Sequence, residues 1–277
     1  MAFRPPALIA ALACLALFAA SAAPGADARE LLLATTTSVR DSGLLDAILP
    51  PFTVKTGIRV KVIAVGSGAA LEMARKGDAD LVIAHAPESE AKLVAEGALV
   101  ARRSFAENYF LIAGPADDPA HVKGAGSAVE AIQRIAAAKA PFATRGDESG
   151  THQRERKLFE GAGLPPNPDW TGVLRTGAGM GQTLQVAGEK RAYVLTDDAT
   201  FRSFRERTGL VAFSGPDPAL HNVYSVLLVP EARFEPGRIH AAGARALATY
   251  LVEPATLERI AHFGAEGGAP PLFRPLP

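Results

Sequence analysis

The segment "GIRVKVIAVGSGAALEMARKGDADLVIAHAPESEAKLVAEG" (residues 57–97) alternates two kinds of hydrophobic periodicity. Valines at positions 60, 62 and 65 indicate a strand, a Gly-Ser-Gly step at 66–68 indicates a tight turn, and residues 70–76 are typical of a helix. The apolar run "ADLVIAH" (79–85) then predicts a buried strand, and residues 88–96 predict a second helix. Strands that alternate with helices favour a parallel sheet with crossover connections.

The same order recurs around this segment. Residues 30–52 predict a strand, a polar loop and a helix, whereas "ENYFLIAGP" (107–115) and "HNVYSVLLVP" (221–230) are strand-like runs that end in a proline. We interpret the last two as strands that cross between two lobes. The predicted fold is α/β and two-lobed, each lobe a mixed sheet flanked by helices, with a double-stranded hinge.

The two crossing strands set the predicted boundaries. Residues 29–110 plus 228–277 form lobe 1, and residues 111–227 form lobe 2. No Ser/Gly-rich linker separates them, which favours a double-stranded hinge over two domains on a flexible tether. The terminal segment "EGGAPPLFRP" (266–275) is expected to be irregular.

Residues 1–28 have the features of an export signal. Arg4 precedes an apolar run, and Ala26-Asp27-Ala28 matches the small-residue pattern of a cleavage site. The sequence therefore predicts a cleaved signal peptide and a periplasmic protein. Cys14, the only cysteine, lies inside this segment, so the mature chain would carry no disulfide and no thiol; a lipid-anchored form is the less favoured alternative.

Charge and motif content exclude several functions. The chain has 29 basic and 29 acidic residues without a block of one sign, which argues against nucleic-acid binding. The six histidines lack metal-ligand spacing, no G-x-S-x-G elbow occurs, and "TGAGMGQTL" (176–184) lacks the dinucleotide spacing. We therefore predict no enzyme activity, no cofactor and no metal cation held by protein ligands.

Three segments instead share one design. Residues 35–38 (Thr-Thr-Thr-Ser), 66–68 (Gly-Ser-Gly) and 149–151 (Ser-Gly-Thr) each place small hydroxyl residues at a predicted helix N-terminus. Each alone is most simply a helix cap or turn. Together, at strand-to-helix junctions of an α/β protein, they predict an anion site built from backbone N–H groups and hydroxyls. Residues 176–182 could add a further contact.

The third segment belongs to "RGDESGT" (145–151), which allows three interpretations: an exposed adhesion tripeptide, a helix cap with an incidental arginine, or an anion pocket. The tripeptide lies directly before a helix and not at a loop tip, so the adhesion interpretation is the weakest. Asp147 could itself be the cap. In the anion interpretation Arg145 supplies the full positive charge, with a fork suited to oxyanion oxygens.

The chain resembles the periplasmic solute-binding proteins (type II) of ABC importers, specifically the tungstate-binding TupA type. The resemblance rests on "ATTTSVRDSGLL", "VGSGAALEMARKGDADLVIAHAPESE", "ENYFLIAGP", "TRGDESGTHQRE", "GMGQTLQVAGEKRAYVLTD" and "NVYSVLLVP", which follow one another through nearly the whole mature chain. It implies a monomeric clamp that closes on tungstate or molybdate and docks on an inner-membrane permease with its ATPase. The positions that take the ligand role are Thr36, Thr37, Ser38, Ser67, Gly68, Arg145, Ser149, Gly150 and Thr151.

One position bears on the choice of anion. Phosphate-binding relatives resemble Arg145–Thr151 but usually carry an aspartate where this chain has His85, and a protonated phosphate needs such an acceptor. His85 therefore favours an unprotonated anion, acting either as a donor or as a packed supporting residue. Asp147 stays a possible acceptor, and Asp197 either orients Arg145 or caps the next helix. A phosphate or sulfate binder, or less favoured an enzyme or sensor on the same fold, remain the alternatives.

Overall fold

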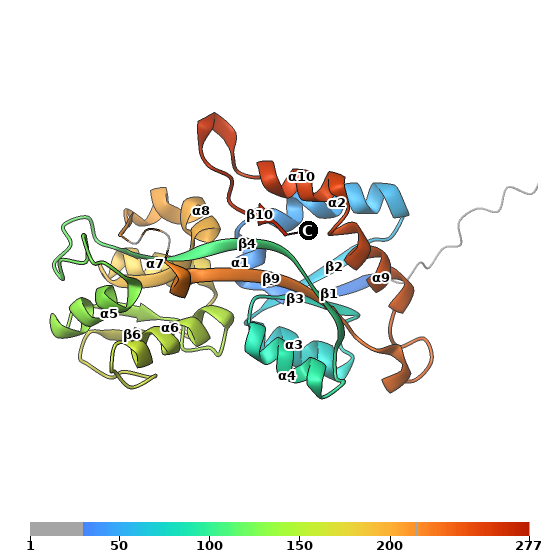
Figure 1. Ribbon diagram of the computed structural model, residues 1–277, viewed down its shortest axis with the longest axis horizontal. Helices are drawn as coiled ribbons and strands as arrows, with labels where there is room; N and C mark the ends of the chain where they lie inside the picture. Colours follow the sequence, from blue (N-terminus) through green and yellow to red (C-terminus); the bar gives the residue numbers. More distant parts are fainter. Residues whose placement is uncertain (1–29, 214, 216, 277) are drawn as a thin grey trace, which may run out of the picture.

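The structure, a computed structural model, describes residues 30–213, 215 and 217–276. The predicted signal peptide, residues 1–28, lies outside the described residues. Figure 1 shows two halves joined by two long strands that run side by side, β4 (Val100–Gly114) and β9 (His221–Leu228). These strands pair antiparallel, with Asn108 opposite Asn222 at the crossing.

The first half contains three parallel strands, and helices lie on both sides of them. The strands are β1 (Leu31–Thr36), β2 (Val60–Val65) and β3 (Leu81–Ala84). The helices are α1 (Thr37–Asp41), α2 (Leu44–Thr56), α3 (Ser67–Lys76), α4 (Pro87–Ala95), α9 (Ala241–Tyr250) and α10 (Pro254–His262), with 3₁₀ turns η2 (Glu231–Arg233) and η3 (Glu266–Gly268).

The second half repeats this plan. Its strands are β5 (Phe142–Thr144), β6 (Val173–Arg175), β7 (Tyr193–Asp197) and β8 (Val211–Ala212). Its helices are α5 (Ala128–Ala137), α6 (Gly150–Gly161), α7 (Met180–Glu189) and α8 (Asp198–Thr208), with the 3₁₀ turn η1 (Pro218–Leu220).

The strand order is β2-β1-β3-β9-β4-β7-β5-β6. The outer strands of each half run parallel, while β9 and β4 run antiparallel to their neighbours, so each half has a mixed sheet. The α/β fold class with mixed sheets flanked by helices is thereby confirmed. The sheets are mixed because the two crossing strands, β4 and β9, lie between the parallel βαβ units of the two halves.

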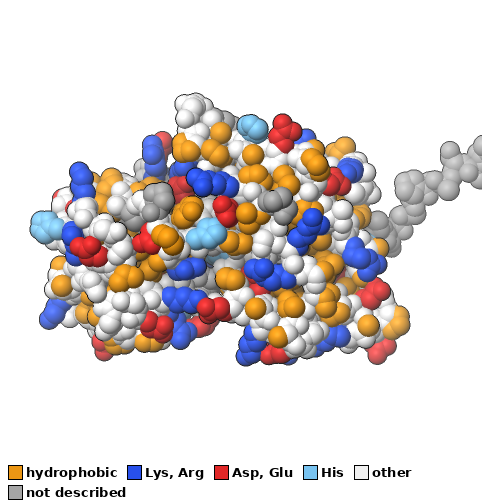
Figure 2. Space-filling view, viewed as in Figure 1, with side chains coloured by type: hydrophobic (Ala, Val, Ile, Leu, Met, Phe, Trp, Pro, Cys, Tyr) orange, Lys and Arg blue, Asp and Glu red, His pale blue; other side chains and the backbone are white. Residues whose placement is uncertain are grey.

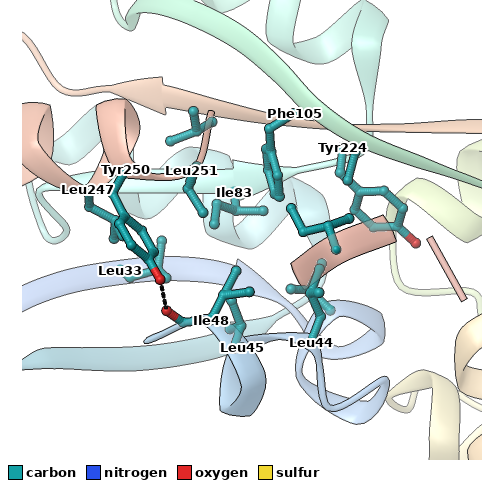
Figure 3. Packing of buried hydrophobic residues seen from close by; sticks show 14 of the residues in the cluster. Leu33, Leu44, Leu45, Ile48, Ile83, Phe105, Tyr224, Leu247, Tyr250 and Leu251 are labelled. Atoms are coloured by element: carbon teal, nitrogen blue, oxygen red, sulfur yellow. Dashed lines mark hydrogen bonds between the residues drawn. The ribbon is translucent and has the colours of Figure 1, made fainter. Parts of the chain in front are cut away.

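Each half has its own apolar core. In the first half, Leu33, Ile48, Phe105 and Leu247 pack between the sheet and α2, α9 and α10, and the Tyr250 hydroxyl donates to the Ile48 carbonyl oxygen at 3.0 Å (Figure 3). In the second half the core gathers residues between positions 110 and 220. This separation supports the lobe boundaries near residues 110 and 228, which stay a prediction.

The C-terminal segment differs from the expectation. Residues 266–275 were expected to be irregular, but Arg274 and Pro275 form a short strand, β10, antiparallel to Glu107 and Ala106 of β4. Phe273, just before β10, is buried against Tyr224 of β9, with ring centroids 5.3 Å apart. The tail is therefore anchored by an aromatic contact onto the hinge strands, and two residues are too few to show strand periodicity in the sequence.

Candidate functional site

The three predicted segments all lie where a strand ends and a helix begins. Residues 36–38 join β1 to α1, residues 66–68 join β2 to α3, and residues 145–150 join β5 to α6. Because Thr36 is paired with Val65 in parallel register, the first two junctions lie next to each other at one sheet edge. This edge, at the carboxyl ends of the strands, is where open α/β sheets bind ligands.

The N-termini of α3 and α6 meet across the two halves. The Gly150 amide donates to Ser67 Oγ at 2.9 Å. A Cβ atom on Gly66 would lie 3.4 Å from the Asp147 carbonyl oxygen, and one on Gly150 would lie 2.9 Å from the His85 carbonyl oxygen. Glycine at position 150 therefore permits a backbone approach that a side chain would obstruct, whereas the distance at position 66 is an ordinary van der Waals contact.

The N-terminus of α7 is the fourth part of the site. The Met180 amide lies 3.3 Å from Thr37 Oγ1, and the Gly181 amide lies 3.2 Å from Asp41 Oδ2. The preceding loop is tied to the Arg145 loop, because the Gly177 amide donates to the Arg145 carbonyl oxygen at 2.9 Å. Residues 176–182, which the sequence suggested as a further contact, thus join the predicted segments.

Buried donors without partners gather among these segments. Arg145 is only 1% exposed; its Nη2 pairs with Asp147 Oδ2, but its Nε has no hydrogen-bond partner within the described part of the chain. Thr35 Oγ1 and Thr151 Oγ1 are likewise buried and unpartnered there. Leaving such a group unsatisfied costs about 1–3 kcal/mol, so the arrangement favours a guest that supplies acceptors.

Most predicted ligand residues are buried, and two have local roles that leave their hydroxyl hydrogens free. Thr36 caps α1 by accepting from the Val39 amide at 3.2 Å, and Ser149 caps α6 by accepting from the His152 amide at 3.2 Å. Both hydroxyls can still donate. The buried predicted positions are Thr36, Thr37, Ser38, Ser67, Arg145, Ser149, Gly150 and Thr151, and Gly68 is half-buried.

Asp147 is not the helix cap that the sequence allowed. Its Oδ1 accepts from the Ser149 amide at 3.2 Å, and its Oδ2 accepts from Arg145 Nη2. Both carboxylate oxygens are therefore engaged within the loop, where the aspartate fixes the guanidinium of Arg145.

His85 is held from behind by the hinge strands. Its Nδ1 lies 2.9 Å from Asn222 Oδ1, and its ring stacks on Tyr224 with centroids 5.1 Å apart. Asn222 Nδ2 donates to Asn108 and to the Tyr224 hydroxyl, so Asn222 Oδ1 is the acceptor and His85 Nδ1 carries the proton.

Burial, and then the nearby Arg145 charge, lower the pKa of His85 to about 4. The ring is neutral at neutral pH, and with Nδ1 protonated its Nε2 cannot donate. These contacts favour the supporting role of His85 over the donor role.

Asp197 caps a helix. Its Oδ1 accepts from the Thr200 amide at 2.9 Å and its Oδ2 from the Thr200 hydroxyl at 2.7 Å, at the start of α8. The same hydroxyl lies 3.4 Å from the Ser38 carbonyl oxygen, so the cap also steadies the α1 segment. Burial raises the pKa of Asp197 to about 6.

The site is thus a set of neutral donors around one guanidinium. Helix N-termini and hydroxyl groups can bind an anion without a positively charged side chain. The macrodipoles of α3, α6 and α7 add positive potential at their N-termini. A second cation lies close by, because Arg154 lines a small hollow with His85 and Gly150. Among the described residues no group of three or more His, Cys, Asp or Glu side chains could hold a metal ion.

Comparison with known proteins identifies the family of this chain. The PBP superfamily domain matches residues 21–255. The chain is 38% identical over 248 residues to the tungstate-binding protein TupA of Peptoclostridium acidaminophilum, covering 89% of this chain and 85% of that protein. The chain belongs to the TupA family of the PBP superfamily.

Two solved structures extend this TupA-family assignment to the fold. A structure described as the tungstate ABC transporter from Geobacter sulfurreducens is 40% identical with a TM-score of 0.77, covering 84% of this chain and 98% of that one. The tungstate-binding protein TupA from Desulfovibrio alaskensis G20 is 37% identical with a TM-score of 0.73, covering 90% and 99%. Their described functions are binding and transport, so this TupA-family chain belongs with binding proteins and not with enzymes.

Sequence reasoning missed several residues around the site of this TupA-family chain. Asp41 and Asn222 make contacts over 140 and 137 positions of sequence, respectively. Glu155 lies on α6, where a glutamate between polar neighbours looks solvent-exposed, yet it is fully buried behind Arg145. No local sequence pattern indicates such contacts. For Thr35, whose buried hydroxyl has no partner among the described residues, the signal in the sequence was its place in the hydroxyl cluster 35–38.

Proposed function

We propose that this protein is the solute-binding component of an ABC importer that captures a tetrahedral oxyanion, tungstate or alternatively molybdate, between its two halves. The observation that carries the proposal is the buried Arg145 guanidinium with an unpartnered Nε, set among the N-termini of α3, α6 and α7. The tungstate-binding relatives support the choice of anion.

Binding would require no chemistry on the anion. A dianion enclosed by neutral donors and one guanidinium is excluded from water, and each hydrogen bond to charge contributes about 1.5–3 kcal/mol. The proposed contacts come from Thr36, Thr37, Ser38, Ser67, Gly68, Arg145, Ser149, Gly150 and Thr151, with His85, Asp147 and Asp197 behind them.

The clamp would close about the β4–β9 hinge, with residues 29–110 plus 228–277 as one lobe and 111–227 as the other. The separate cores and the contacts between α3 and α6 and between α1 and α7 support this division. Closure about a hinge of few strands is a common way for such proteins to enclose ligands.

The contacts of Asp147 and His85 argue against phosphate. A protonated phosphate needs an acceptor, and Asp147 offers only the lone pairs left beside the two bonds that its oxygens accept from its own loop. The aspartate position of phosphate-binding relatives is held by His85, whose Nδ1 is bound to Asn222. Sulfate lacks a proton as well, and it would be distinguished by its shorter bonds, which fit a fixed donor set differently.

We propose a periplasmic monomer that delivers the anion to an inner-membrane permease with its ATPase. Lys/Arg and Asp/Glu side chains are interspersed on the face shown in Figure 2, in keeping with no role in binding nucleic acid. Within residues 30–213, 215 and 217–276, no helix has the length and apolar character needed to span a bilayer.

Thermal unfolding with tungstate, molybdate, sulfate and phosphate, followed by calorimetry, tests the proposal. A ligand that binds only the folded state stabilises it by RT ln(1 + [L]/Kd), so the tightest anion gives the largest rise in Tm. We expect tungstate and molybdate to exceed sulfate and phosphate. No response to any of the four anions, or a response only to an organic solute, would overturn the proposal.

A further inference from the structure

Glu155 is a buried carboxylate that the binding mechanism above does not use. It lies on α6 and is fully buried. The Thr144 hydroxyl donates to its Oε2, and the Arg145 amide nitrogen lies 3.3 Å from both of its carboxylate oxygens. The side chain therefore ties the helix to the end of β5 and to the backbone of the residue that carries the site's guanidinium.

The charged groups acting on Glu155 belong to the same loop. The Arg145 guanidinium favours the ionised carboxylate, and the Asp147 carboxylate disfavours it. Burial is the largest influence, because desolvation penalises the charged form. It outweighs the Arg145 charge and the hydrogen bonds from the Thr144 hydroxyl and the Arg145 amide, which favour the ionised form, and raises the pKa of Glu155 to about 8.

The other elements packed on α6 use their charged groups elsewhere. On α5, Glu130 pairs with Arg134 at 2.6 Å, and on β7, Asp197 caps α8. On α6 itself, Arg154 donates to the Ala219 carbonyl oxygen at 2.8 Å, and His152 Nδ1 lies 3.5 Å from Glu148 Oε1.

We infer that Glu155 is a positioning residue that fixes the Arg145 loop and couples oxyanion affinity to pH by retaining one proton beneath the site. The inference rests on the proposed function. An ionised carboxylate held 3.3 Å from the Arg145 amide nitrogen would repel a dianion bound by the Arg145 guanidinium. The protonated group keeps both tethers, because a carboxylic acid still accepts from the Arg145 amide and can share its proton with the Thr144 hydroxyl.

The sign of the coupling follows from linkage. A bound dianion disfavours the ionised carboxylate further, so the complex holds the proton more tightly than the free protein does. Raising the pH through the pKa of free Glu155 therefore weakens binding. We expect the dissociation constant for tungstate to rise about fivefold between pH 7 and pH 9. Tungstate itself stays a dianion over this range.

The experiment compares the pH profiles of tungstate affinity in the wild-type chain, Glu155→Gln and Glu160→Gln, measured by calorimetry from pH 6 to 9.5. Glutamine mimics the protonated acid, so Glu155→Gln should bind like the wild type at pH 7 with a nearly flat profile. Glu160 is an exposed residue on the same helix, so Glu160→Gln should keep the wild-type slope.

A second variant tests the positioning role. Glu155→Met removes both acceptors and leaves the Arg145 amide unpartnered, so we expect tungstate affinity at pH 7 to fall at least about fivefold. If Glu155→Met does not fold, the pH profile of Glu155→Gln still tests whether Glu155 couples tungstate affinity to pH. A wild-type profile that is flat, or equal slopes in the wild type and Glu155→Gln, overturns the inference while tungstate binding itself stands. Absence of binding in the wild type overturns the proposed function instead.

Discussion

Arg145 is buried, yet its guanidinium lacks part of its hydrogen-bond partners among the described residues. Its Nη2 is held by Asp147 while Nε is unpartnered, so part of the guanidinium is fixed and part is free to meet a ligand. A planar fork of this kind can bind two oxygens of one anion, which a lysine ammonium cannot reproduce.

Arg145→Lys should therefore weaken tungstate binding at least about tenfold, since about 1.4 kcal/mol of lost contact corresponds to tenfold. Calorimetry with tungstate measures the change. Arg191→Lys is a matched control, because Arg191 is 66% exposed in a surface ion pair and follows the C-terminal end of α7, whose N-terminus lies at the site. Unchanged affinity in Arg145→Lys would remove Arg145 from the site.

His85 makes folding stability sensitive to acid. Its folded-state pKa is lowered from 6.5 to about 4, so the unfolded chain binds a proton more readily than the folded one between these values. The contribution of neutral His85 to stability is complete above pH 6.5 and is lost as the pH falls toward 4, by up to about 3 kcal/mol.

His85→Asn should keep the donor to Asn222 but remove the titration. We expect the difference in unfolding free energy between the wild type and His85→Asn to shrink by up to about 3 kcal/mol from pH 7 to pH 4. Urea unfolding at several pH values measures it. Leu210→Ala, a buried site without a titrating group, should instead give a constant offset; a constant offset in His85→Asn as well would contradict the assignment.

At the scale of elements, the meeting of α3 and α6 depends on Gly150. A methyl group there would lie 2.9 Å from the His85 carbonyl oxygen and 3.0 Å from Ser67 Oγ, both of which belong to the first half. These distances are too short for a Cβ atom, so the two junctions would be held apart.

Gly150→Ala should thus lower tungstate affinity at least about tenfold while the ligand-free protein stays folded, because the clash arises only when the halves meet. Affinity by calorimetry and unfolding by circular dichroism check the two parts. Gly215→Ala, where an added methyl would meet no atom of the described, non-adjacent residues within 4 Å, serves as the control. Wild-type affinity in Gly150→Ala would show that this approach is not needed for binding.

Helix starts and strands were the elements that local sequence predicted best. Caps and glycine turns act within a few residues, so "GSG" and "SGT" located the starts of α3 and α6, and valine spacing located β2. Predicted helix 70–76 begins earlier, at Ser67, since the turn itself joins the helix. Contacts between distant segments, such as Asp41 with Gly181, and the two-residue β10 carry no periodic signal.

For the whole molecule, the halves touch through contacts of very different strength. The Gly150–Ser67 bond is buried, whereas the pair between Lys157 and Glu88 at the rim is 44% and 73% exposed. Exposed pairs contribute about 0–1 kcal/mol, so closure should depend on the buried site and its ligand more than on the rim.

Ligand-dependent closure should be visible as compaction. Small-angle X-ray scattering of the wild type should show a smaller radius of gyration after tungstate is added, as expected for a clamp that closes about a hinge. Gly150→Ala at the same concentrations should show a smaller change or none. Equal radii for the wild type with and without tungstate, at saturating anion, would argue that the halves do not move.

The attachment of β10 to β4 has a practical consequence for turning this protein into an optical sensor. Arg274 and Pro275 are bonded to the hinge strand, and Arg202 of the second half donates to the Pro270 carbonyl oxygen at 2.5 Å. A fluorescent protein fused directly after this tail would strain the pairing of β10 with β4 and so disturb the hinge about which the halves move. An insertion into an exposed loop of each half would leave that pivot untouched.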